Sequence, residues 1–142
     1  MAMKLTSYLL FNGNCEEAFK FYEKCLGGKI IAMLPHTGTP AEQHMPAGFG
    51  NKILHARLDV GDQMIMASDC PPDRYELPKG FSVSITVTDP AEAERIFHEL
   101  EVGGKVELPI QQTFFSPRFG MLRDRFGTPW MVNCAQAAEH AS

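Results

Sequence analysis

His55 is the residue of this chain whose type and neighbours best suit acid–base chemistry. Polar and apolar residues alternate through residues 51–60, which is the period of a half-buried strand. The alternation places His55, Arg57 and Asp59 on one face and leaves the other face apolar. Because imidazole titrates near neutral pH, His55 is the candidate catalytic residue. The alternatives are a structural histidine bonded across the sheet and a polar face that meets solvent.

The other histidines and the cysteines give weaker signals. His36 and His44 fall in residues 36–50, whose prolines and glycines predict a loop of about 15 residues without regular structure. We expect both to be exposed, with a lid over a site as the alternative. Cys134 lies in an apolar alternating strand, which favours an inert thiol over a nucleophile. The four scattered cysteines indicate reduced thiols rather than a disulfide framework or a zinc site.

The first half of the chain predicts a strand, a helix and three further strands. Residues 6–11 form the first strand, and Asn14 with Glu17 fits a capping box ahead of a helix over 15–26. Gly27 and Gly28 end this helix. Strands follow at residues 29–34, 51–60 and 63–67.

The second half repeats this order. A strand over 81–88 leads to Asp89 as a cap, Pro90 as the first helical residue and a helix to residue 102. A strand over 105–110 and a hairpin over 119–134 follow, and Trp130 is expected in the core. The fold class is therefore α+β, with two tandem βαβββ modules at residues 4–68 and 81–135, a connector at 69–80, and one domain over 1–142.

Composition narrows the class of protein. The chain has 142 residues, 44% of them hydrophobic, and a net charge of -4. These are values of a globular domain, and the negative charge argues against a nucleic-acid partner. No apolar run reaches the roughly 18 residues of a membrane span, and the N-terminus lacks the apolar region of a signal peptide. We therefore expect a cytoplasmic protein with no membrane partner.

Three stretches carry a resemblance to a known family: residues 8–22 (YLLFNGNCEEAFKFY), 54–57 (LHAR) and 119–134 (FGMLRDRFGTPWMVNC). Together they resemble the PhnB-like proteins of the vicinal oxygen chelate superfamily, which includes glyoxalase I, bleomycin-resistance proteins and extradiol dioxygenases. The resemblance implies that the two sheets form a cup with the helices on its outer face, that a small organic ligand lies in the cup, and that the protein is a homodimer. The implied ligand-binding residues are Arg57, Met66, Ser82, Ser84, Phe115, Arg118 and Asn133, beside His55.

The superfamily's divalent metal is held by His, Gln or Glu on the first and last strands of each module. Here those strands carry Thr6–Tyr8, Gln63–Ala67, Phe81–Val83 and Pro129–Cys134, and none of them holds a His, Asp or Glu. Hydroxyls, amides and thioethers are poor ligands for such metals. We therefore expect neither the standard metal site nor another cofactor.

Three functions remain open within the resemblance. The preferred one is small-molecule binding with an unidentified reaction. The alternatives are a metal-dependent lyase, isomerase or dioxygenase, and a sequestering protein of the bleomycin-resistance kind. Similar proteins carry a demethylubiquinone methyltransferase label, but a nucleotide-like methyl donor normally lies at a Gly-rich turn of a doubly wound sheet, which this pattern does not predict.

Overall fold

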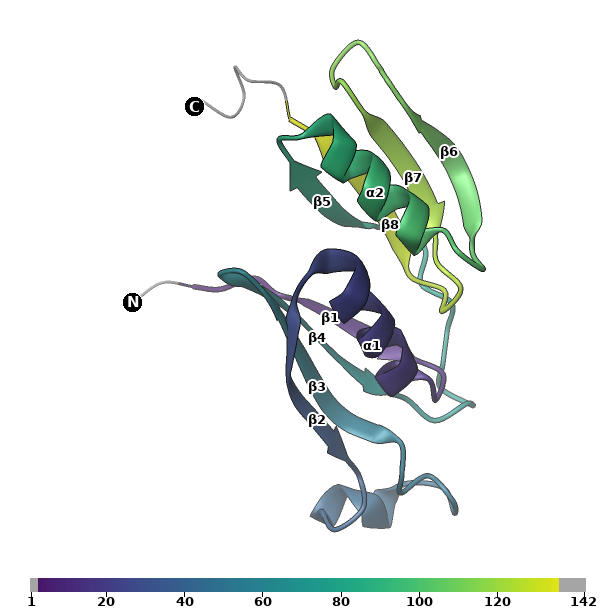
Figure 1. The fold of residues 1–142 in the computed structure, drawn as a ribbon. Helices are drawn as coiled ribbons and strands as arrows, with labels where there is room; N and C mark the ends of the chain where they lie inside the picture. Colours follow the sequence, from purple (N-terminus) through teal and green to yellow (C-terminus); the bar gives the residue numbers. More distant parts are fainter. Residues whose placement is uncertain (1–2, 136–142) are drawn as a thin grey trace. The chain divides into compact units, whose positions relative to one another are not determined.

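The computed structural model describes residues 3–135 and divides the chain into two compact units between Glu76 and Leu77. Each unit has one α-helix lying on one face of a four-stranded sheet (Figure 1). The α+β class and the two tandem modules are therefore confirmed. No helix within residues 3–135 is both long and apolar enough to cross a membrane.

The first module has the sheet order β1-β4-β3-β2. Strand β1 runs parallel to β4, and the other pairs are antiparallel. The elements are β1 (Ser7–Phe11), α1 (Cys15–Leu26), β2 (Lys29–Pro35), the 3-10 helix η1 (Pro40–His44), β3 (Ile53–Val60) and β4 (Gln63–Asp69). Strand β4 thus runs one residue past the expected end of the module.

The second module repeats this topology as β5-β8-β7-β6, again with its first and last strands parallel. Its helix ends at Leu100, two residues earlier than expected, and its first strand begins at Val83, so that Ser82 lies outside it. The elements are β5 (Val83–Val87), α2 (Pro90–Leu100), β6 (Lys105–Gln111), β7 (Phe119–Arg123) and β8 (Pro129–Cys134).

Each core lies between a helix and the apolar face of its sheet. In the first module Phe11 packs against Phe19 and Tyr22 of α1, and all three are buried. In the second module Phe97 of α2 lies over Gly120 of β7, where a Cβ would come within 2.6 Å of the Phe97 ring. A side chain at position 120 would therefore push the helix away from the sheet.

The predicted cap of α1 is wrong in its acceptor. The Asn14 side chain makes no capping hydrogen bond. Instead, the buried carboxylate of Asp69 accepts from the Cys15 amide at 2.9 Å and from the Ile53 amide at 2.9 Å. Because Asp69 ends β4 directly beside the end of β1, a long-range contact takes the place of the local cap. In the second module Asp89 caps α2 as predicted, accepting from the Ala91 amide.

The segment 36–50 is more ordered than the sequence suggested. It contains η1, and its ends are joined by backbone hydrogen bonds from His36 to Lys52 and from Thr37 to Gly50. The expectation of an exposed His36 is wrong, because its ring is buried against Phe49 and its Nδ1 lies 3.0 Å from the Lys52 carbonyl. A role of this segment as a lid stays a prediction.

The outer strands β2 and β6 are irregular. The pairing of β2 with β3 shifts register between Ile30 and Ala32, and again before Pro35. The pairing of β6 with β7 shifts twice as well, and Pro109 lies inside β6. A proline has no amide hydrogen to give to a ladder, so Pro109 interrupts β6, and Pro35 is the last residue of β2.

The four cysteines are free thiols, and Cys15, Cys25 and Cys134 are buried. Burial raises the pKa of the Cys15 thiol, and the neighbouring carboxylates of Asp69 and Glu16 raise it further. Cys15 is therefore a protonated, unreactive core residue at neutral pH.

His98 on α2 gives the protein a small pH dependence of stability. Partial burial lowers the pKa of its ring, but hydrogen bonds to Glu94 and Glu101 outweigh this effect and raise the pKa above its ordinary value of 6.5. The protonated His98 ring therefore stabilises the folded state. This stabilisation is fully present below pH 6.5 and is lost as pH rises through the folded-state pKa of His98. We expect His98→Gln to lower the free energy of unfolding at pH 6 by about 0.3–0.5 kcal/mol and to change it less at pH 8.

Urea denaturation of both proteins at the two pH values, at low and high salt, measures this effect. His44→Gln is the matched control, because His44 is exposed on η1. An equal loss of stability at both pH values would mean that the charge of His98 plays no part.

Candidate functional site

The open face of the first module is the side of its sheet opposite α1. Strand register places Arg57 beside Met66, and Met66 beside Tyr8. His55 lies on the same face, beside Leu34. The residues that the strand register places on this face are Tyr8, Leu10, Lys29, Ala32, Leu34, His55, Arg57, Asp59, Met64, Met66 and Ser68.

Tyr8 and His55 are joined across this open face. Tyr8 stands on β1 and His55 on β3, so the two side chains meet over the intervening strand β4. The rings are stacked with centroids 6.1 Å apart, and the Tyr8 hydroxyl lies 3.4 Å from His55 Nδ1. A hydroxyl that donates to Nδ1 leaves a proton on Nε2, which makes His55 a hydrogen-bond donor toward a ligand. The opposite tautomer makes Nε2 an acceptor and His55 a base.

Arg57 is held by a carboxylate on its own strand. Its Nε donates to Asp59 at 2.7 Å and its Nη2 donates to the other Asp59 oxygen at 3.3 Å. This hydrogen bond raises the pKa of the Arg57 guanidinium, which therefore stays charged. The Arg57 side chain is 39% exposed and the Asp59 side chain 29% exposed, so both are accessible on the open face.

The second module carries different chemistry at the matching positions. The two modules can be aligned by their strand pairs. Ala56 of β3 pairs with Ala67 of β4, and Gly120 of β7 pairs with Val132 of β8 at the matching position. Tyr8, His55 and Arg57 therefore correspond to Ser84, Phe119 and Met121. His55 and Arg57 are thus replaced by an aromatic ring and a thioether, Tyr8 is replaced by the smaller hydroxyl of Ser84, and the acid–base candidate occurs in the first module alone.

The candidate residues of the second module fall on both sides of its sheet. Ser84 and Asn133 lie on the open face, and Phe115 contacts Phe119 of that face edge-to-face with ring centroids 5.1 Å apart. Arg118 lies on the other side, where its Nε donates to Glu94 of α2 at 2.9 Å. Their roles in ligand binding stay predictions.

Asn133 has one feature of a binding residue. Its Oδ1 is a buried acceptor without a hydrogen-bond partner among the residues that the structure describes. Its register partners are Thr86 and Phe119. An unsatisfied buried oxygen costs about 1–3 kcal/mol, a cost that a donor on a ligand would relieve.

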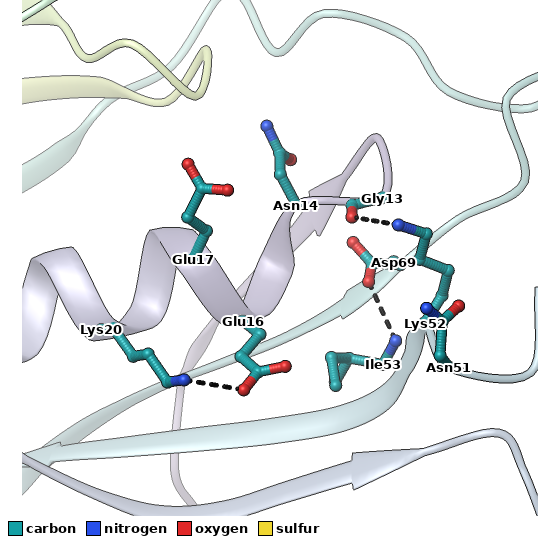
Figure 2. Close-up of a pocket in the computed structure, with 9 residues that line it drawn as sticks. All are labelled: Gly13, Asn14, Glu16, Glu17, Lys20, Asn51, Lys52, Ile53 and Asp69. Carbon is teal, nitrogen blue, oxygen red and sulfur yellow. Dashed lines mark hydrogen bonds and ion pairs between the residues drawn. The ribbon is translucent and has the colours of Figure 1, made fainter.

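A cavity of 390 Å³ lies at the start of α1, on the helix side of the first sheet (Figure 2). Most of its charged groups already serve the fold, whereas the buried Oδ1 of Asn14 has no hydrogen-bond partner among residues 3–135. Lys52 Nζ donates to the Gly13 carbonyl at 3.0 Å, Asp69 accepts from backbone amides, and Lys20 pairs with Glu16. The charges of this cavity therefore largely neutralise one another, and the open face is the better candidate site.

The described residues do not suit the superfamily's metal. Within residues 3–135, no group of three or more His, Cys, Asp or Glu side chains is placed to hold a metal ion. The matching positions on the first and last strands carry Tyr8, Met66, Ser84 and Met131. These hydroxyls and thioethers do not form the three-ligand set of a catalytic metal site.

Tyr8 is the site residue that sequence reasoning missed. In the sequence analysis Tyr8 was considered only as a residue that is a poor metal ligand. Its contact with His55 depends on the strand order β1-β4-β3, which local sequence patterns do not reveal. The sequence signal is the alternation of the strand Ser7–Phe11, which places Tyr8 on the face opposite Leu9 and Phe11.

Comparison with known proteins agrees with this architecture. Residues 3–133 match the family model described as 3-demethylubiquinone-9 3-methyltransferase. The protein YjdN of Escherichia coli is 32% identical over 139 residues, covering 92% of this chain and 95% of YjdN.

Two solved structures are similar over almost the whole chain. Protein PA1353 from Pseudomonas aeruginosa is 49% identical with a TM-score of 0.87, covering 95% of this chain and 99% of that one. A PhnB protein from Bacillus cereus, described as a putative 3-demethylubiquinone-9 3-methyltransferase, is 25% identical with a TM-score of 0.79, covering 94% of this chain and all of that one. The chain therefore belongs to the PhnB-like family that this model describes.

Proposed function

We propose that this protein binds a small organic molecule on the open face of its first module, and that His55, Tyr8 and Arg57 make the polar contacts. The observation that supports this most is the Tyr8–His55 pair beside Arg57. The second module has the same topology, but its matching positions keep only the Ser84 hydroxyl and carry no imidazole or guanidinium group. A difference in side chains between two modules of one topology supports a ligand site on the module that carries the polar groups.

The surroundings of these residues suit an organic ligand. Met64 and Met66 lie on the same face, and thioethers adapt their shape to apolar groups. Leu10 and Leu34 are about half exposed on either side of the polar residues. An apolar surface with a few convergent polar groups is the usual composition of a small-molecule site.

Any chemistry at this site is proposed to use hydrogen bonds and proton transfer rather than a metal ion. The argument is the donor set, since the positions that hold the metal elsewhere in the superfamily offer hydroxyls and thioethers here. We expect metal analysis of the purified protein after dialysis to find less than one equivalent of divalent ion. One bound equivalent, with glyoxalase activity restored by nickel or zinc, would return the protein to the metal-dependent enzymes.

Methyl transfer is not the function that we propose, although the family model has that description. A nucleotide-like methyl donor is normally bound at a Gly-rich strand-to-helix turn of a doubly wound sheet. In this chain the corresponding turn has only Gly13, and the helix covers one face of a module whose sheet is mixed. Sequestration without turnover remains the second candidate, and a homodimer is the proposed assembly, by analogy with the superfamily.

A fragment screen tests the proposal. Saturation-transfer NMR with the wild-type protein identifies fragments that bind, and the same fragments are then measured with His55→Gln and Tyr8→Phe. We expect binding to weaken about tenfold in His55→Gln, since a lost hydrogen bond to a ligand is worth about 1 kcal/mol or more. His98→Gln, with its histidine on the outer face of α2, is the control. Fragments that bind both variants as tightly as the wild type would contradict the proposed site.

A further inference from the structure

We infer that the ligand of the open face is an organic acid, whose carboxylate binds the end of the Arg57 guanidinium formed by Nη1 and Nη2. This inference rests on the proposed function and names the chemical class of the ligand. It follows from the way in which Asp59 holds Arg57.

A guanidinium group presents two forks of N–H donors to carboxylates. Asp59 occupies the side fork, which consists of Nε and Nη2. Among residues 3–135, no other acceptor is seen for Arg57, so the end fork points away from Asp59 with its donors unused. An arginine held on one side is rigid, and a rigid fork loses less entropy when it binds a planar anion.

The neighbours of Arg57 leave the end fork accessible. Its partner on β2 is Ala32, a small residue, and its partner on β4 is Met66. The described carboxylate on this face, Asp59, is already paired with Arg57. His55 with its Tyr8 partner adds a second donor when Nε2 carries the proton. Two donors and a thioether surface suit a molecule with an acidic end and an apolar body.

A neutral ligand is the opposing possibility, because Asp59 already balances the charge of Arg57. The two possibilities differ in what they predict for an acid and its amide, which have nearly the same shape. Benzoate with benzamide, and phenylacetate with phenylacetamide, are suitable pairs. If the end fork binds the ligand, the acid of each pair binds more tightly, since a charge-assisted hydrogen bond is stronger than a neutral one.

The test uses full-length protein labelled with 13C in the methionine methyl groups. Met64 and Met66 report on the open face of the first module, and Met121 and Met131 report on that of the second. We expect each acid to shift the Met66 signal and to bind about tenfold more tightly than its amide.

Two variants separate charge at Arg57 from charge elsewhere. Arg57→Gln is expected to remove the preference for the acid, while Arg74→Gln, the same change at an exposed connector residue, preserves it. Arg57→Lys keeps the charge but loses the fork, and an intermediate preference is expected. Dispersed methyl spectra of all variants confirm that they fold.

The outcomes distinguish this inference from the proposed function. Equal shifts of Met66 by acid and amide would overturn the organic-acid class and leave the site in place. Shifts confined to Met121 and Met131 would overturn the proposed site as well. No methyl shift with any of the acids up to their solubility would also overturn the inference, because accessible end-fork donors must respond to a carboxylate.

Discussion

Replacing Trp130 with alanine is expected to lower the free energy of unfolding by about 3–5 kcal/mol, the range for large aromatic side chains removed from a core. Trp130 is 1% exposed, and its indole Nε1 donates to Asp124 Oδ2 at 2.7 Å. The other oxygen of Asp124 accepts from the amides of Phe126 and Thr128. The substitution therefore leaves a cavity and also removes a partner from a buried carboxylate. Urea denaturation followed by circular dichroism measures the change.

Two further variants help to separate the contribution of the Trp130 ring volume from that of its hydrogen bond to Asp124. Trp130→Phe keeps most of the ring volume but cannot donate to Asp124, so we expect a smaller loss of about 1–3 kcal/mol. Phe114→Ala is the matched control, because that aromatic ring is 97% exposed and its removal should change stability little. If Trp130→Ala and Phe114→Ala have the same denaturation midpoint as the wild type, Trp130 does not hold the core of the second module together.

Replacing Asp69 with alanine has the second-largest expected effect, a loss of about 3 kcal/mol. The buried carboxylate accepts from the amides of Cys15 and Ile53, which begin α1 and β3, and Figure 2 shows it between these elements. Hydrogen bonds to a charged group contribute about 1.5–3 kcal/mol each, and buried amides left without partners add to the cost. The start of α1 should therefore fray, and its amides should exchange with solvent faster.

Asp69→Asn and Asp62→Ala serve as comparisons for this prediction. Asparagine keeps one acceptor oxygen, so its variant should lie between alanine and the wild type. Asp62 is exposed in the turn between β3 and β4, and its replacement removes the same charge without a buried contact. Equal stability of the Asp69 and Asp62 alanine variants would show that the long-range cap contributes nothing.

The fold could be predicted from local sequence patterns because the helices and strands of each module are marked by their own residue spacing and end signals. The helix limits follow from apolar spacing and from stops such as Gly27, which has the left-handed conformation of a helix end. The cap of α1 could not be predicted in this way. Asn14 and Glu17 form a plausible local motif, but Asp69, which is 54 residues from Cys15, is brought to the same place by the pairing of β1 with β4. His36 was misjudged for the same reason, since Phe49 and Lys52 enclose it only after the loop closes.

The site was predictable to the extent that it follows strand alternation. His55 and Arg57 share a face because they are two residues apart on one strand, and that was visible in the sequence. The contact with Tyr8 depends on the order of strands in the sheet, which alternation does not specify. Arg118 was assigned to the ligand site by the resemblance alone. It directly precedes Phe119 of the open face, so alternation places it on the helix side, where it pairs with Glu94.

The interrupted outer strands have a consequence for how copies of this protein meet. An outer strand with a regular ladder is a template onto which another chain can add, and such growth leads to polymers. Register shifts and a proline in both β2 and β6 remove that template. The remaining outer strands, β1 and β5, have five residues each, which offers little length for pairing. Growth of either sheet by strand addition is therefore disfavoured at both of its edges, and this protects the protein from runaway assembly at high concentration.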